Sequence, residues 1–171
     1  FRQKHHLENK YILLGVAFGW GKRKGLDVFI ELSKRLDERF QIVLVGTNDE
    51  IDKQLPANII SIHKTDNQKE LAEIYSAADL FVNPTREENY PTVNMESIAC
   101  GTPVLTFNTG GSPEIPDVKT GYIVDVDGID EMEKQIIKIC TDNVFSMNDC
   151  LKRACSFDKN EKFEEYINLY Q

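Results

Sequence analysis

Short apolar runs alternate with helical patterns along the whole chain. The runs are continuous, as in QIVLVG at residues 41–46, which is typical of parallel strands covered on both faces of a sheet. The expected strands are residues 11–17, 41–46, 59–62, 79–83, 103–107 and 121–126. The expected helices are residues 24–36, 68–76, 92–100, 129–140, 144–155 and 158–170. We therefore predict a doubly wound α/β domain with a six-stranded, mainly parallel sheet.

The size and charge of the chain limit its possible functions. With 171 residues it is too short for two ordinary domains, so we expect residues 1–171 to form one. A net charge of −8 argues against a nucleic-acid partner, because phosphate-backbone binding needs a basic face. No apolar run approaches the roughly 18 residues that span a bilayer. Four cysteines without a CxxC pair indicate reduced, buried thiols and a cytoplasmic location.

The segment 84–104 carries two acids, Glu88 and Glu96, with seven residues between them. A proline suits the first turn of the helix that follows, so the N–H groups of Thr92 and Val93 should be free to bind an anion. The Glu96 carboxylate, one turn further, can accept two hydrogen bonds from the vicinal diol of a ribose. On spacing alone, a solvated loop acid at Glu88 and a helix-dipole partner at Glu96 are equally good interpretations.

A glycine-containing loop with three cations follows the first expected strand. Lys22, Arg23 and Lys24 lie at the start of a predicted helix, where positive charge opposes the helix dipole. A bound anion would compensate for this placement, and the neighbouring glycines would let the backbone approach it. The alternative interpretation is a solvated basic turn.

Two further segments lie at the carboxyl ends of expected strands. Gly110 and Gly111 precede Ser112, which we expect to cap a short helix, and their amides could face a sugar or phosphate. The alternative is a purely structural turn. His63 follows the third expected strand, where its ring could pack on a nucleobase, although a surface histidine is an equal alternative. No sequence spacing of metal ligands stands out.

Taken together and in this order, the segments resemble the donor-binding domain of retaining GT-B glycosyltransferases of family 4, the group 1 glycosyl transferases. The similarity covers about residues 10–170. The motifs that carry it are Glu88 and Glu96 followed by SIACGTPV (97–104), the Lys24–Gly25 pair, TGGSPEI (109–115) and LAEIYSAADLFVN (71–83). The resemblance implies a Rossmann-like sheet that is one half of a GT-B fold.

The resemblance also implies roles for the matching residues. Lys24 would neutralise the departing diphosphate, Glu88 would lie near the donor sugar, and Glu96 would bind the ribose. The backbone N–H groups expected to contact phosphate or sugar are those of Thr92, Val93, Gly110 and Gly111. The residues expected to border the nucleobase are His63 and Lys64. No metal or other cofactor is implied.

Two positions depart from the family pattern. The family usually places an arginine six residues before the lysine, where this chain has Phe18, and Lys22 or Arg23 could substitute for it. The second departure lies in residues 84–91, which we call the acidic loop. The glycine that usually follows its aromatic residue is replaced by Pro91, which removes one backbone donor.

The resemblance predicts the donor-binding half of an enzyme that transfers a sugar from a nucleotide-diphosphate sugar, with retention, to a glycan or glycolipid acceptor. The acceptor would bind an amino-terminal domain that this chain lacks, so the chain alone should bind donor without turnover. The full-length protein could associate peripherally with a membrane through that other half. In the family the last helix crosses to the other domain, so its apolar face should be partly uncovered here, or repacked onto this domain or onto a neighbouring copy. Alternatives are a GT-B sugar-nucleotide epimerase and a non-catalytic module that binds a nucleotide or phosphosugar.

Overall fold

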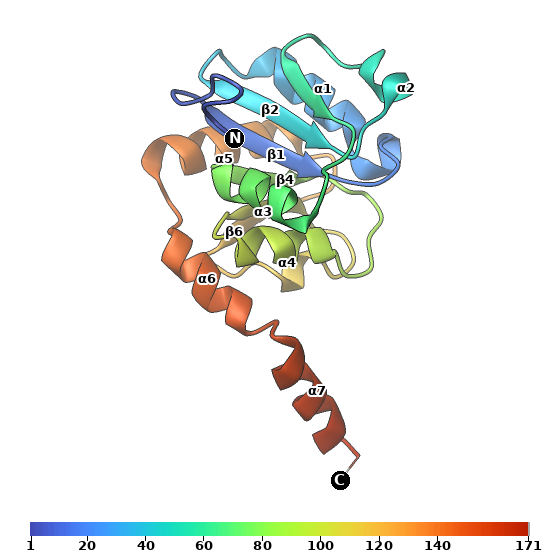
Figure 1. Cartoon of the computed structure of the whole chain (residues 1–171), viewed down its shortest axis with the longest axis vertical. Coiled ribbons are helices and arrows are strands. Elements are labelled where there is room, and N and C mark those ends of the chain that lie inside the picture. The colour runs from blue at the N-terminus through green and yellow to red at the C-terminus, as the bar shows by residue number, and fades with distance from the viewer. Residues whose placement is uncertain (171) are drawn as a thin grey trace.

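The computed structural model describes residues 1–170 as one central sheet with helices on both sides (Figure 1). The strands are β1 (Tyr11–Val16), β2 (Phe40–Val45), β3 (Ile59–Ile62), β4 (Leu80–Asn83), β5 (Val104–Phe107) and β6 (Gly121–Val124). The α-helices are α1 (Leu26–Arg35), α2 (Asp49–Asp52), α3 (Gln68–Ala77), α4 (Thr92–Ala99), α5 (Ile129–Asp142), α6 (Met147–Cys155) and α7 (Lys159–Asn168). Two 3-10 turns are η1 (Lys22–Lys24) and η2 (Ser112–Glu114).

The sheet confirms the predicted doubly wound topology. Its strand order is β3-β2-β1-β4-β5-β6, and every pairing is parallel. The chain winds outward from β1 in one direction and from β4 in the other, so β1 and β4 are neighbours whose following loops diverge. A crevice for a ligand is expected at the carboxyl end of such a strand pair.

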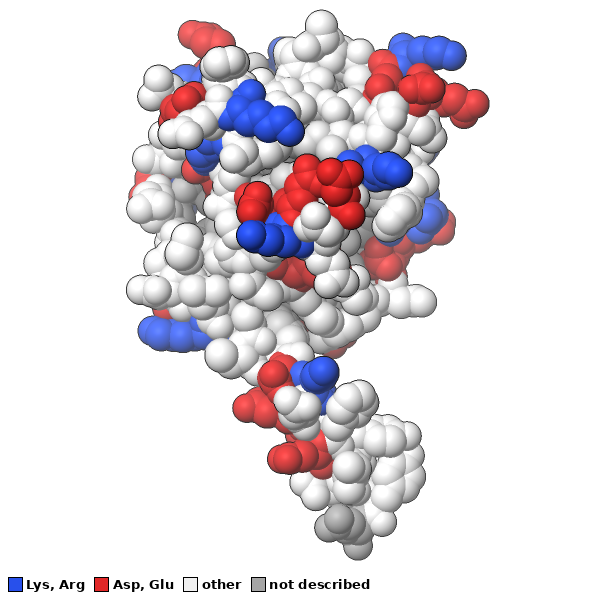
Figure 2. All heavy atoms as spheres, viewed as in Figure 1, with Lys and Arg blue, Asp and Glu red and all other residues white. Residues whose placement is uncertain are grey.

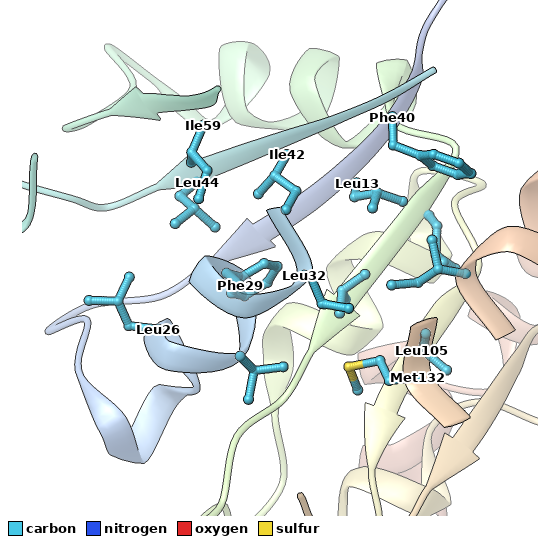
Figure 3. Packing of buried hydrophobic residues seen from close by; sticks show 14 of the residues in the cluster. Leu13, Leu26, Phe29, Leu32, Phe40, Ile42, Leu44, Ile59, Leu105 and Met132 are labelled. Carbon is cyan, nitrogen blue, oxygen red and sulfur yellow. The ribbon is translucent and has the colours of Figure 1, made fainter. Parts of the chain in front are cut away.

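Two apolar layers cover the sheet because successive residues of a strand point to opposite faces. Leu13 of β1 packs with the apolar residues of α1 and α5, including Phe29 and Met132 (Figure 3). Its neighbours Ile12 and Leu14 pack on the other side, with residues from α3, α4 and α6. Both layers are fully formed within this chain, which fits the continuous apolar strands of the sequence.

Several boundaries differ from the predicted ones, and each has a local cause. The first helix begins at Leu26 rather than at Lys24, because Gly25 adopts φ 75° and separates η1 from α1. Helix α2 was not predicted; it spans only four residues and is capped by the side chain of Asn48. Helix α6 begins at Met147 rather than at 144, because Ser146 caps it by accepting from the Asp149 N–H.

Two predictions about individual side chains were wrong. Ser112 is not a helix cap: Gly111 takes that position, and the Ser112 hydroxyl is buried without a partner among residues 1–170. The cysteines were expected to be buried, yet Cys100 is half-buried and Cys155 is exposed, whereas Cys140 and Cys150 are buried.

The last helix projects away from the body of the molecule (Figure 1). Every residue of α7 is exposed, including the apolar side chains of Phe163, Tyr166 and Ile167. Of the predicted outcomes, the structure therefore shows the uncovered face and no repacking of α7 onto the described residues of this chain. No helix within residues 1–170 is both long and apolar enough to cross a bilayer.

Asp79 directly precedes β4, at the end of the sheet opposite the predicted crevice. Its hydrogen bonds allow a test of stability. Its Oδ2 atom accepts from the N–H of fully buried Ile12 at 2.7 Å and from Arg2 Nη2 at 2.5 Å. We expect Asp79→Ala to lower the free energy of unfolding by about 2–3 kcal/mol, because it leaves a buried donor unpaired. Urea unfolding measures this loss.

Asp37→Ala is the matched control for Asp79→Ala, since Asp37 also pairs with an arginine, Arg39, but at the surface. We expect it to lower the free energy of unfolding much less than Asp79→Ala does, because the pair is exposed to water. Equal costs for the two variants would show that the Ile12 N–H does not depend on Asp79.

Candidate functional site

The loops that follow β1 and β4 meet at the point where the sheet reverses its winding direction. Backbone and side chain both join them: the Arg86 N–H donates to the Arg23 carbonyl at 2.9 Å, and the Thr85 hydroxyl donates to the same oxygen at 3.4 Å. Gly25 lies at this junction, where a Cβ atom would meet the Pro84 carbonyl oxygen at 2.4 Å. Only glycine therefore fits at the predicted Lys-Gly pair.

Lys24 and Glu88 form an ion pair across this junction. Lys24 Nζ donates to Glu88 Oε2 at 2.6 Å, and both side chains are mostly buried, with 18% and 20% of their surface exposed. The other carboxylate oxygen of Glu88 accepts from the Asn89 N–H at 3.2 Å. The structure thus brings together the predicted residues Lys24 and Glu88. The Lys24 ammonium is partly desolvated, and an anionic ligand could bind it in place of Glu88 or together with Glu88.

Arg86 holds the acidic loop in place, a function that the sequence analysis missed. Its guanidinium binds both carboxylate oxygens of Asp27 at 2.8 and 2.9 Å, and it donates to Asp127 at 2.7 Å through Nε. It also donates to the Lys22 carbonyl. Hydrogen bonding to Asp27 raises the pKa of Arg86, and the same contact lowers the pKa of Asp27. Since two carboxylates already neutralise Arg86, its role is to position the loop.

Gly110 and Gly111 pack directly under the acidic loop. A Cβ atom at Gly110 would lie 1.7 Å from the Glu88 carbonyl oxygen, and one at Gly111 would lie 2.5 Å from the Asn89 carbonyl oxygen. The Gly111 N–H donates to that Asn89 oxygen at 2.6 Å, so in this structure it is not free for a phosphate or sugar. The Gly110 N–H makes no hydrogen bond to the described residues.

The start of α4, at Thr92, comes four residues after Glu88 in the sequence. Pro91 is its N-cap residue and offers no side-chain cap, so the N–H groups of Thr92 and Val93 have no partner within the helix. Asn94, in the same turn, is completely buried and accepts from Asn83 Nδ2 at 2.8 Å. Its own Nδ2 has no partner among residues 1–170. This helix end is therefore rich in unused donors, as the sequence predicted for Thr92 and Val93.

Glu96 lies one turn further along α4, where its side chain is exposed and its Oε2 atom accepts from the Tyr75 hydroxyl at 3.1 Å. Glu96 borders a cavity of about 340 Å³ between α3 and α4. Glu96 and Glu88 have different partners, Tyr75 and Lys24, and no hydrogen bond joins Glu96 to Glu88 or Lys24.

His63 and Lys64 are exposed and follow the end of β3, and neither forms a hydrogen bond or ion pair with Lys24 or Glu88. His63 Nε2 lies 2.8 Å from Asp52 Oδ2 and 3.9 Å from Asp49 Oδ1. One potential ligand atom from each of these three residues lies within 4.8 Å of the others, so the group has the composition of a cation site. Sequence spacing did not indicate this group, because the two acids lie in the unpredicted helix α2.

The pair of His63 and Asp52 supplies a test by pH. The hydrogen bond to Asp52 raises the pKa of His63 above the ordinary value of 6.5. Hydrogen bonds from Ser61 and then from His63 lower the pKa of Asp52 below 3.8. The pair therefore stabilises the fold between these two perturbed pKa values. The contribution is lost as pH rises through the His63 value or falls through the Asp52 value.

We expect NMR titration to place His63 above 6.5 and His5 below it, because burial and Lys4 lower the pKa of His5. Asp52→Asn should return His63 toward 6.5, whereas Asp49→Asn, at the longer distance, should change it less. An unchanged His63 titration in Asp52→Asn would contradict the contact.

The arrangement of loops at the strand ends can be compared with known proteins. The sequence pattern of the family described as glycosyl transferases group 1 matches residues 9–142. The chain belongs to this family. This confirms the family resemblance and identifies the sheet as the Rossmann-like half of a GT-B fold. The description of the family names enzymes that transfer a glycosyl group.

Individual relatives support the family assignment. A Campylobacter jejuni protein named N,N'-diacetylbacillosaminyl-diphospho-undecaprenol alpha-1,3-N-acetylgalactosaminyltransferase is 24% identical over 178 aligned positions, which cover 99% of this chain and 47% of that protein. Sucrose-phosphate synthase from Thermosynechococcus elongatus has the same fold, with a TM-score of 0.83 and 22% identity over 99% of this chain and 47% of that one.

Anabaena HepE, solved in complex with UDP and glucose, gives a TM-score of 0.79 at 17% identity and covers 98% of this chain and 50% of its own. The chain therefore spans about half the length of the relatives that it matches.

Proposed function

We propose that this chain is the donor-binding half of a glycosyltransferase that uses a nucleotide-diphosphate sugar and retains the configuration of the transferred sugar. The observation that carries the proposal is the Lys24–Glu88 ion pair, held at 2.6 Å where the loops after β1 and β4 meet. A partly buried cation beside the free N–H groups of a helix start is suited to a diphosphate. The solved complex of the neighbour HepE with UDP and glucose supports this choice of ligand.

In the proposed reaction the leaving group is a nucleoside diphosphate, which gains negative charge as its bond to the sugar breaks. Lys24 and the N–H groups of Thr92 and Val93 stabilise that charge. Glu88 lies near the donor sugar, and its pairing with Lys24 holds the carboxylate at the junction of the two loops. Glu96 binds the ribose hydroxyls, and the backbone near His63 and Lys64 borders the base. With Lys24 and backbone donors in this role, we expect no metal or other cofactor to be required.

The other half of the enzyme supplies the acceptor site in this proposal. The relatives are about twice as long as the matched region, which leaves room for a second domain of similar size. The exposed apolar side chains of α7 would pack against that domain. This chain alone would bind the donor in the cytoplasm without transferring sugar, and a glycan or glycolipid acceptor would bind the other domain, which could contact a membrane peripherally.

Calorimetric titration of the chain with UDP, GDP and ADP tests the proposed donor site. We expect at least one of them to bind at millimolar or lower concentration, and we expect Glu96→Ala to weaken that binding. If none of the three binds, the donor site is wrong. If one binds equally well to Glu96→Ala, the ribose role of Glu96 is wrong while the rest of the proposal stands.

Acidic and basic side chains are interspersed on the face shown in Figure 2, and no extended basic patch gathers there. This distribution, like the net charge of −8, favours a small anionic ligand over a nucleic acid. An epimerase or a binding module would also bind nucleotide. Joining the chain to its acceptor domain separates these classes, because only a transferase would then move the sugar to an acceptor.

A further inference from the structure

One buried hydroxyl contacts the proposed ribose-binding acid from the neighbouring helix. Tyr75, in α3, is 1% exposed, and its hydroxyl donates to Glu96 Oε2 at 3.1 Å. Helices α3 and α4 are adjacent on the same face of the sheet (Figure 1). The second carboxylate oxygen of Glu96, Oε1, makes no hydrogen bond to any residue from 1 to 170, so it remains available to a ligand.

The Tyr75 side chain is fixed in place. Its ring packs against Phe81 with the ring centres 5.5 Å apart, and its carbonyl oxygen accepts from the buried Thr102 hydroxyl at 2.7 Å. Burial, together with the charge of Glu96, raises the pKa of Tyr75, so the hydroxyl keeps its proton and remains a donor at any working pH. A rigid donor of this kind restricts where an exposed carboxylate can lie.

The contact lies beside an open cavity. The volume of about 340 Å³ between the two helices is lined by Leu71, Ala72 and Tyr75 on one side and by Glu96, Ala99 and Cys100 on the other. It extends to Gln68, the first residue of α3, which follows the loop that carries His63 and Lys64. Glu96 therefore lines the same cavity as Gln68, which begins α3 directly after the proposed base-binding loop, and this is where we place the sugar of a nucleoside.

We propose that Tyr75 is a positioning residue that holds the Glu96 carboxylate toward the ribose hydroxyls and so makes the site prefer ribose to 2′-deoxyribose. The inference rests on the proposed function, because it needs a nucleotide whose ribose reaches Glu96. Without the Tyr75 hydroxyl, an exposed glutamate samples several rotamers and loses part of its hydrogen bonding to the 2′-hydroxyl.

The test compares the dissociation constants of UDP, GDP or ADP, whichever binds the chain best, with those of its 2′-deoxy counterpart. We expect the wild-type chain to prefer the ribonucleotide, and Tyr75→Phe to reduce that preference by about threefold to tenfold. The variant keeps the buried ring and removes one oxygen atom. General damage to the site would weaken both nucleotides equally and leave the ratio unchanged.

Glu96→Gln, alone and combined with Tyr75→Phe, tests whether Tyr75 affects the ratio of dissociation constants through Glu96. If Tyr75 acts through Glu96, adding Tyr75→Phe to Glu96→Gln should change the ratio no further. Tyr11→Phe is the matched control. Tyr11 is the first residue of β1, at the end of the strand opposite the proposed site, so this variant should leave the ratio at its wild-type value.

The outcomes separate this inference from the proposed function. If the ratio of the dissociation constants for the 2′-deoxynucleotide and the ribonucleotide changes in Glu96→Gln but not in Tyr75→Phe, the inference is wrong and the proposed function stands. A chain that binds none of the nucleotides, or a ratio that Glu96→Gln does not alter, would overturn both the ribose role of Glu96 and the inference.

Discussion

Replacing Lys24 with alanine should weaken the binding of a nucleoside diphosphate by about tenfold to a hundredfold. The substitution removes the mostly buried cation that we assign to the diphosphate, and it leaves the Glu88 carboxylate unpaired at 20% exposure. That carboxylate would then repel the ligand, so the loss should exceed that of one hydrogen bond. Calorimetric titration with the best-binding of UDP, GDP and ADP measures the change.

The nature of the Lys24 effect can be checked with a second ligand and a second lysine. The loss should be larger for the diphosphate than for the corresponding monophosphate, since Lys24 is assigned to the diphosphate group. Lys34→Ala is the control, because Lys34 is an exposed lysine that pairs with Glu31 on the surface of α1. Equal losses from Lys24→Ala and Lys34→Ala would contradict a direct contact with the ligand.

Substitution of Gly110 by alanine should disrupt both the fold and the site. The new Cβ atom would lie 1.7 Å from the Glu88 carbonyl oxygen, so the acidic loop or the glycine loop must move. The positive φ of 49° adds backbone strain for any residue with a side chain. We expect a loss of about 3 kcal/mol in the free energy of unfolding, together with weakened nucleotide binding.

Gly19→Ala separates the two causes of the Gly110 effect. Gly19 also has a positive φ, 69°, but no atom lies within 4 Å of the position its Cβ would take. Its substitution should cost about 1 kcal/mol, from backbone strain alone. If urea unfolding gives the same loss for both variants, contact between the Gly110 position and the acidic loop does not restrain the site.

Much of the fold could be predicted from the sequence because the signals are local. Continuous apolar runs predicted six parallel strands. The structure has all six, and each observed strand boundary lies within two residues of the predicted one. Errors occurred where a boundary depends on a contact distant in sequence. Lys24 was assigned to a helix, yet Gly25, packed against Pro84, interrupts it.

The candidate site was less predictable than the fold. Motif spacing identified Lys24 and Glu88, and the structure brings them together. It did not identify Arg86, whose partners Asp27 and Asp127 lie 59 and 41 residues away in the chain. The Gly111 N–H was predicted to be free, but the turn of the acidic loop presents the Asn89 carbonyl to it. Such hydrogen-bond partners follow from the path of loops, for which residue types carry little information.

The Lys24–Glu88 ion pair connects the two apolar layers described above. The loop with Lys24 leads into α1 on one face of the sheet, and the loop with Glu88 leads into α4 on the other. The separation of these two charges is therefore governed by how both helices seat against the strands between them. Substitutions deep in either apolar layer, far from any bound sugar, would therefore change the distance between the Lys24 and Glu88 charges at the strand ends.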